Sequence, residues 1–134
     1  MNENIFNYLK EYGFNKEELF EFPKVNDELY FYDIELIKTN ISFFEEKGLT
    51  NNEIIDLFKK NPYLFTIGSK RKNMLDDIYN NIFSKEELKS LILRYEYLYT
   101  LGPKEVEEKI ENIKKLNLNI KEEIIKNPDI LYTE

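Results

Sequence analysis

The sequence offers few of the side chains that usually perform catalysis. Its 134 residues include no Cys and no His, which excludes thiolate nucleophiles, imidazole bases and ordinary tetrahedral zinc sites. Carboxylates could bind Mg²⁺ or Ca²⁺, yet no Asp-x-Asp-x-Asp-Gly run or comparable oxygen-rich loop is present. The adjacent glutamates at 86–87 and 122–123 could act as acid and base, but a helix start already requires one member of each pair. We therefore expect a binding protein, not an enzyme, without metal or cofactor.

Positive charge is concentrated in one segment of the chain. The cluster consists of Lys59, Lys60, Lys70, Arg71 and Lys72, and an offset of 34 residues aligns Arg94 with Lys60 and Lys104 with Lys70. Cations at a regular spacing could follow a phosphate backbone, with Tyr63, Tyr97 and Tyr99 as stacking surfaces. The alternative is that the cations complement helix dipoles and the tyrosines pack between helices.

The N-terminal third is strongly acidic. Residues 1–47 hold 5 Lys and 11 Asp or Glu, a net charge of −6, whereas residues 48–134 have a net charge of −1. The candidate acidic face consists of Glu11, Glu17, Glu18, Glu21, Asp27, Glu28, Asp33 and Glu35, and the aromatic residues Phe20, Phe22, Tyr30, Phe31 and Tyr32 lie among them. Such a surface could dock on a basic protein or occupy a nucleic-acid channel in place of phosphate, and it could also simply keep a small domain soluble.

These charged residues belong to an internal repeat. The segments that begin at Leu49 and Phe83 match at an offset of 34 residues, a weaker copy begins at Gly13, and a shorter one begins at Leu118. In each copy a short polar residue is followed three positions later by Glu, the pattern of a capping box at a helix start. The four pairs are Asn15 with Glu18, Thr50 with Glu53, Ser84 with Glu87, and Asn119 with Glu122. In the first three copies an apolar residue before the cap faces another after the first helical turn. The fourth copy lacks this apolar pair, which is typical of a terminal capping repeat.

Longer amphipathic stretches over 34–47, 70–82 and 104–117 separate the short helices, and we expect each to be the second helix of a unit. Gly13 and Gly48 suit left-handed helix ends, and prolines 23, 62 and 128 stand where the short helices stop. Segments 29–32 and 97–100 have strand propensity, but their length and placement favour turns or 3₁₀ segments. The expected core includes Leu57, Phe58, Leu64, Phe65, Leu91, Ile92 and Leu98.

The predicted fold is all-α, a right- or left-handed helical solenoid of three to four helix-pair repeats that forms a single domain over residues 1–134. The repeats are expected at roughly 13–47, 48–82, 83–117 and 118–134. Residues 48–65 follow the pattern Gly-Leu-Thr-x-x-Glu-Ile-Ile-x-Leu-Phe-Lys-Lys-Asn-Pro-Tyr-Leu-Phe, which resembles the repeat of the mitochondrial transcription termination factor (mTERF) family. The resemblance implies units of two helices and a short 3₁₀ helix, stacked into a curved solenoid whose concave basic face holds nucleic acid. This chain is shorter than usual for the family, and it is acidic.

Two functions remain as interpretations of the sequence. In the first, the acidic face docks on a protein partner with a basic surface, such as a nucleic-acid-binding enzyme, and inhibits or regulates it, by analogy with phage inhibitors of the anti-CRISPR kind. In the alternative, the basic cluster of residues 59–104 binds nucleic acid as the mTERF resemblance implies. A homo-oligomer that stacks through the end near Tyr132 is a third possibility. No targeting or membrane segment is recognisable, so we expect a cytoplasmic protein.

Overall fold

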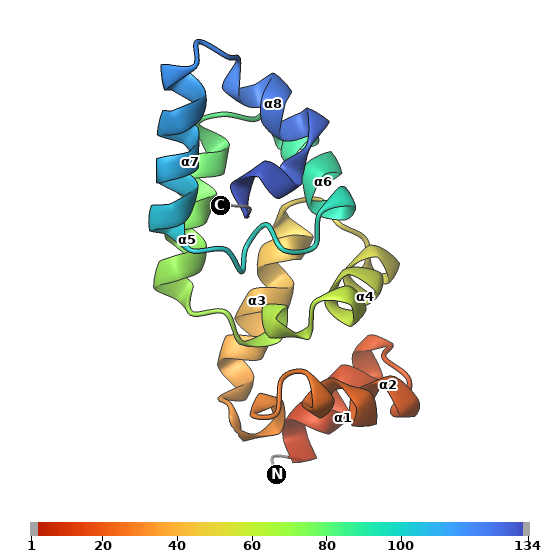
Figure 1. Cartoon of the computed structure of the whole chain (residues 1–134). Coiled ribbons are helices and arrows are strands. Elements are labelled where there is room, and N and C mark those ends of the chain that lie inside the picture. The colour runs from red at the N-terminus through yellow and green to blue at the C-terminus, as the bar shows by residue number, and fades with distance from the viewer. Residues whose placement is uncertain (1–2, 133–134) are drawn as a thin grey trace. The chain divides into compact units, whose positions relative to one another are not determined.

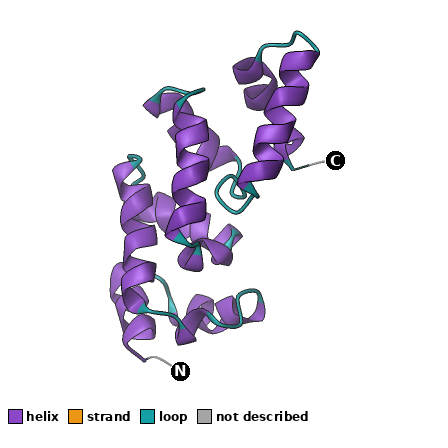
Figure 2. Ribbon diagram, turned by 90° about the vertical axis from the view of Figure 1, so that its left-hand side faces the viewer, coloured by secondary structure: helices purple, strands orange, loops and turns teal. Residues whose placement is uncertain are grey.

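The computed structural model describes residues 3–132, and within that range it contains helices and no strands (Figures 1 and 2). The α-helices are α1 (Glu3–Tyr12), α2 (Lys16–Glu21), α3 (Ile34–Glu46), α4 (Asn51–Lys60), α5 (Ser69–Asn80), α6 (Lys85–Arg94), α7 (Pro103–Lys115) and α8 (Ile120–Lys126). The 3₁₀ helices are Phe22–Lys24, Leu29–Phe31, Pro62–Thr66 and Pro128–Leu131. The expectation of an all-α helical-repeat fold is confirmed.

The helices alternate in a regular order along the chain. The predicted long stretches correspond to α3, α5 and α7, and the short helices with capping patterns correspond to α2, α4, α6 and α8. A 3₁₀ helix or a turn follows each short helix. Segment 29–32 is mostly 3₁₀ helix and segment 97–100 is a turn, as expected. An additional helix, α1, precedes the first capping box.

Three of the four capping boxes form completely. In the third, the Glu87 N–H donates to Ser84 Oγ at 3.2 Å, and the Ser84 N–H donates to Glu87 Oε1 at 2.8 Å. The boxes at Asn15 and Thr50 have the same reciprocal bonds. At the fourth, only the bond from the Glu122 N–H to Asn119 Oδ1 is present, at 3.0 Å. Each reciprocal box satisfies two backbone donors that a helix start leaves unpaired, which fixes where the short helix begins.

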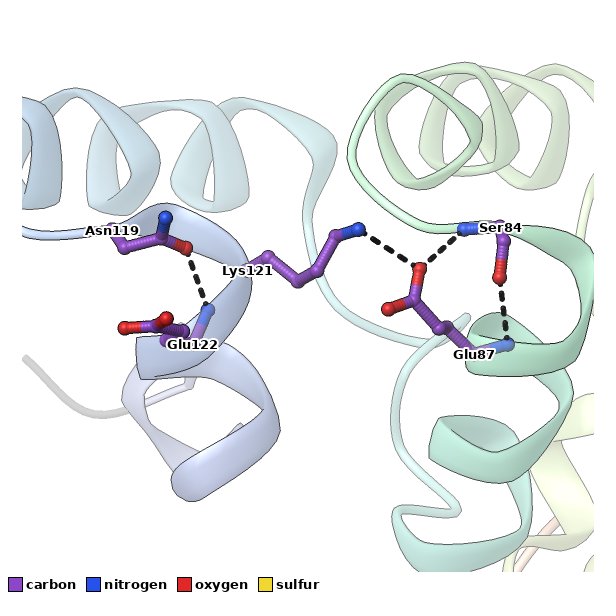
Figure 3. A network of polar contacts seen from close by, with 5 residues as sticks. All are labelled: Ser84, Glu87, Asn119, Lys121 and Glu122. Carbon is purple, nitrogen blue, oxygen red and sulfur yellow. Dashed lines mark hydrogen bonds and ion pairs between the residues drawn. The ribbon is translucent and has the colours of Figure 1, made fainter.

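Glu87, the glutamate of the third capping box, also joins neighbouring repeats. Lys121, in the first turn of α8, forms an ion pair with Glu87 of α6 at 3.0 Å, and Figure 3 shows the two helix starts facing each other across this contact. A hydrogen bond from the Ser84 N–H and the contact with Lys121 lower the pKa of Glu87. This ion pair therefore links the start of α8 to the start of α6.

Three helix junctions use left-handed backbone. Gly13 and Gly48 have φ of 133° and 95°, as expected from the sequence. Asn117 has φ of 58° at the corresponding position after α7. Asn tolerates this conformation better than other non-glycine residues. The Leu118 N–H then donates back to the Ile113 carbonyl at 3.3 Å, which ends α7 and turns the chain toward α8.

The chain divides into two compact units, one up to Gly68 and one from Ser69 onward. In the first unit Phe65 lies at the centre of a buried aromatic cluster, with ring centroids 5.5 Å from Phe14, 5.2 Å from Phe22 and 4.7 Å from Phe58. Asn40 is fully buried beside this cluster and donates to the carbonyls of Phe65 and Ile67 at 2.9 and 3.1 Å. The 3₁₀ helix after α4 is therefore fixed by its side chains and by its backbone.

The second unit has a tyrosine core. Tyr79 and Tyr99 pack edge to face with centroids 5.3 Å apart, and the Tyr99 hydroxyl donates to Asp76 Oδ1 at 2.8 Å. The Tyr79 hydroxyl donates to the Leu98 carbonyl, so both hydroxyls are paired within the unit. The seven residues expected in the core are all buried. None of the described helices is long and apolar enough to span a membrane.

Candidate functional site

Cations end three of the short helices. Lys60, Arg94 and Lys126 are the last residues of α4, α6 and α8, and the residues that follow them have similar extended backbone, with φ between −137° and −149°. A positive charge at a helix C-terminus is favoured by the exposed carbonyl dipoles. Arg94 Nη2 also donates to the Ile125 carbonyl at 2.7 Å, so this guanidinium joins α6 to α8.

Two members of the basic cluster are held by local contacts. Lys59 forms an ion pair with Glu18 at 2.8 Å, and the hydrogen bond raises the pKa of Lys59. Partial burial opposes ionisation of Glu18, but hydrogen bonds from Lys59 and from the Asn15 N–H lower its pKa. Arg71 uses Nε to donate to the Leu101 carbonyl at 3.0 Å and Nη2 to donate to the Thr100 carbonyl. These two cations therefore have structural partners.

Lys72 is only 2% exposed, so its side chain is not on the surface where a phosphate could reach it. Lys70 and Lys104, in contrast, are both exposed. They are the second residues of α5 and α7, two helices that pack against each other (Figure 1). The Arg71 contacts bring the start of α5 beside the residues that precede α7, so Lys70 and Lys104 stand at neighbouring helix starts.

A lysine at a helix start is not explained by helix energetics, because the N-terminal end of the dipole is positive. The start of α7 has no side-chain cap, since its N-cap residue is Gly102. The Glu105 carboxylate folds back over this glycine, where any Cβ would collide with it. Lys104 therefore lies beside backbone N–H groups and a carboxylate, in a place where an anion is locally favoured.

The acidic residues are divided between two clefts of the first unit. Glu17, Glu18 and Glu21 line one cleft of about 440 Å³, which Lys24 and Lys59 also line. Asp27, Glu28 and Asp33 line a second cleft of about 690 Å³, together with Phe31 and Tyr32. Glu11 is exposed on α1 and lines neither cleft.

Several of these carboxylates have local roles. Glu21 pairs with Lys24 at 3.0 Å, Glu35 lies 4.0 Å from Lys38, and Asp33 caps α3 by accepting from the Glu35 N–H. Of the aromatic residues among them, Phe20 and Phe31 are 57% and 74% exposed. Phe22 and Tyr30 belong to the core and are not available as interface anchors.

The tyrosines expected to stack on bases differ in their exposure. Tyr63 and Tyr97 are about half exposed, whereas Tyr99 is buried in the core. Sequence reasoning missed a cleft of about 370 Å³ in the second unit, which Tyr95 and Asp129 line together with Tyr97. In the sequence, the only signal for this cleft is the recurrence of tyrosine after α6. Asp129 belongs to the short fourth copy of the repeat, so its place in the cleft is not evident from the sequence.

Comparison with known proteins agrees with the repeat architecture. The mTERF family model matches residues 1–134, which is the whole chain. No curated protein matches the sequence. The family has a helical-repeat fold, and the alternation of long helix, short helix and 3₁₀ helix or turn corresponds to it. The chain therefore belongs to the mTERF family.

Proposed function

We propose that this protein binds nucleic acid, with phosphate contacts from exposed lysines that recur at equivalent positions of its repeats. The observation that carries the proposal is the pair Lys70 and Lys104, both exposed at adjacent helix starts where the helix itself disfavours a cation. Membership of the mTERF family supports it, because the family suggests a nucleic-acid-binding helical-repeat protein. Lys60 and Lys126 are further exposed cations at repeat positions.

Charge distribution supports a contact on the second unit. Residues 1–68 hold 7 basic and 13 acidic residues, a net charge of −6, whereas residues 69–134 hold 12 and 13, a net charge of −1. A polyanion is repelled by the first unit and meets a nearly neutral second unit, on which individual lysines can act at short range. We therefore expect modest affinity that depends strongly on ionic strength.

The acidic-face interpretation has no support from the family. Six of its eight carboxylates line two clefts, and several of them cap helices or pair with neighbouring lysines. Inhibition of a protein partner, with or without an anti-CRISPR mode of action, stays an untested prediction.

The proposal can be tested by charge reversal. Fluorescence anisotropy with labelled single- and double-stranded DNA and RNA should show binding by the natural protein at about 50 mM salt, and the variant K70E/K104E should bind at least about tenfold more weakly. K10E/K16E is the matched control, because it makes the same change in net charge at two exposed lysines of the first unit. Equal losses in the two variants would contradict a contact at Lys70 and Lys104.

A further inference from the structure

The cleft that sequence reasoning missed has an unusual lining. It lies in the second unit, between the turn that follows α6 and the 3₁₀ helix Pro128–Leu131, and it has a volume of about 370 Å³. Its lining residues are Tyr95, Tyr97, Thr100, Leu101, Asp129 and Tyr132. Three of the six are tyrosines, one is a carboxylate, and none carries a positive charge. Its volume is at the lower end of the range for small-molecule sites, so it suits a compact group.

Tyrosine rings make up half of the lining residues of this space. The rings of Tyr95 and Tyr97 are 5.8 Å apart at their centroids and stand at 78° to each other. Tyr97 is 46% exposed and Tyr132 is 69% exposed, so part of the aromatic surface is open to a ligand. The face of an aromatic ring attracts cations, and rings set at an angle around a small space are an arrangement that recognises them.

The Tyr95 hydroxyl is a buried polar group beside Asp129 that forms no hydrogen bond of ordinary geometry. Tyr95 is only 7% exposed, and its hydroxyl is the single buried side-chain N or O atom without a hydrogen-bond partner in the described part of the chain. Burial, then the charge of Asp129 and hydrogen bonding of the hydroxyl toward that carboxylate, raise the pKa of Tyr95, so the hydroxyl keeps its proton at neutral pH. Buried polar groups in native proteins are normally paired, and the oxygen of this hydroxyl accepts no hydrogen bond, so it can still accept one from a ligand.

We propose that this cleft binds a guanidinium group. Asp129 is the only charged residue among the described lining residues, and its carboxylate can accept two parallel N–H bonds from a planar guanidinium. The plane of the same group can stack on the open face of Tyr97, and a further N–H can donate to the Tyr95 hydroxyl oxygen. An anion is repelled by Asp129, and an ammonium group has neither the flat face nor the fork of donors.

This inference goes beyond nucleic-acid binding and does not depend on it. The guanidinium can come from a free small molecule or from an arginine side chain of a peptide. The chemistry is the same in both cases, and the length of the ligand distinguishes them. Acetyl-arginine amide represents the free group, and acetyl-Gly-Arg-Gly-amide represents the side chain within a peptide.

Binding can be followed on ring signals of ¹³C-labelled tyrosine by NMR titration. We expect saturable shifts of the Tyr95 and Tyr97 signals with both arginine probes, and weaker shifts with the lysine counterpart. The citrulline counterpart, which has nearly the same shape without the charge, should not bind. A tighter peptide complex would identify a peptide as the source, and equal affinities would identify the free group. The proposal is overturned if citrulline or lysine binds as well as arginine, or if no arginine probe shifts these signals at about 20 mM.

Variants separate recognition from a structural role. D129N should weaken arginine binding about tenfold or more, because it removes the charge-assisted bonds, whereas the control D77N removes the same charge from an exposed position on α5. Y95F should weaken binding about two- to tenfold, because it removes an acceptor for one guanidinium N–H, while changing the melting temperature little, since the hydroxyl forms no hydrogen bond of ordinary geometry. Equal binding by D129N and D77N, or unchanged binding together with a lower melting temperature for Y95F, would contradict the proposal.

Discussion

Arg71 and Lys70 are neighbours in sequence, yet the structure gives them opposite roles. The Arg71 guanidinium donates to the carbonyls of Thr100 and Leu101 and so fixes the turn that leads into α7. Lys70 is exposed at the start of α5, where a positive charge opposes the helix dipole. Single substitutions to alanine at the two positions should therefore affect different properties of the protein.

The expected sizes follow from these contacts. A hydrogen bond from a charged donor contributes about 1.5–3 kcal/mol where it is well protected, and Arg71 is exposed, so we discount its two bonds to about 2 kcal/mol in total. R71A should lower the free energy of unfolding by that amount. R71K keeps the charge but loses the planar fork, so it should lose about half as much. K70A should leave the free energy of unfolding within about 0.5 kcal/mol of the natural value, and any change should be a gain, because the lysine charge opposes the helix dipole.

Urea unfolding followed by far-UV circular dichroism measures these differences, and fluorescence anisotropy on the folded variants measures nucleic-acid binding. We expect R71A to change stability and K70A to change affinity. The reasoning is refuted if R71A unfolds at the same urea concentration as the natural protein, or if R71A weakens nucleic-acid binding more than K70A does.

Three further predictions test other contacts. Asn40→Ala should lower the free energy of unfolding by about 3 kcal/mol in urea titrations, because two buried carbonyls lose their donor; a loss below about 1 kcal/mol would contradict this. The lowered pKa of Glu87 means that its contribution to stability is complete above the ordinary glutamate pKa and is lost as the pH falls through the lower folded-state value. E87Q should therefore flatten the dependence of melting temperature on pH between about pH 5 and pH 3, and an unchanged profile would count against it. Glu105→Gln should strengthen nucleic-acid binding in anisotropy titrations, since it removes a carboxylate from the start of α7, and weaker binding would oppose the proposed contact.

Local signals in the sequence predicted most of the fold. A capping box needs residues only three positions apart, so the starts of α2, α4, α6 and α8 could be placed from the sequence. The left-handed residues Gly13 and Gly48 were equally local. Asn117 takes the same conformation without a glycine to indicate it, and α1 precedes the first copy of the repeat, so neither was predicted.

The candidate site was predicted less well because it depends on distant partners. The carbonyls that accept from Arg71 are 29 and 30 residues away, and the one that accepts from Arg94 is 31 residues away. Charge and spacing alone do not distinguish such cations from Lys70, which is exposed. The burial of Lys72 and the meeting of Tyr95 with Asp129 likewise require the folded arrangement of successive repeats.

The central claim is that this chain binds nucleic acid through phosphate contacts, and the salt dependence of binding tests it most directly. Affinity of the natural protein for a labelled oligonucleotide should be measured by anisotropy between about 50 and 200 mM salt. Contacts from Lys70 and Lys104 alone predict a slope of log affinity against log salt near −1.4 for single strands and −1.8 for duplexes, and each further lysine makes the slope steeper. Absence of binding at about 50 mM salt, or binding whose affinity does not change with salt, would contradict the claim.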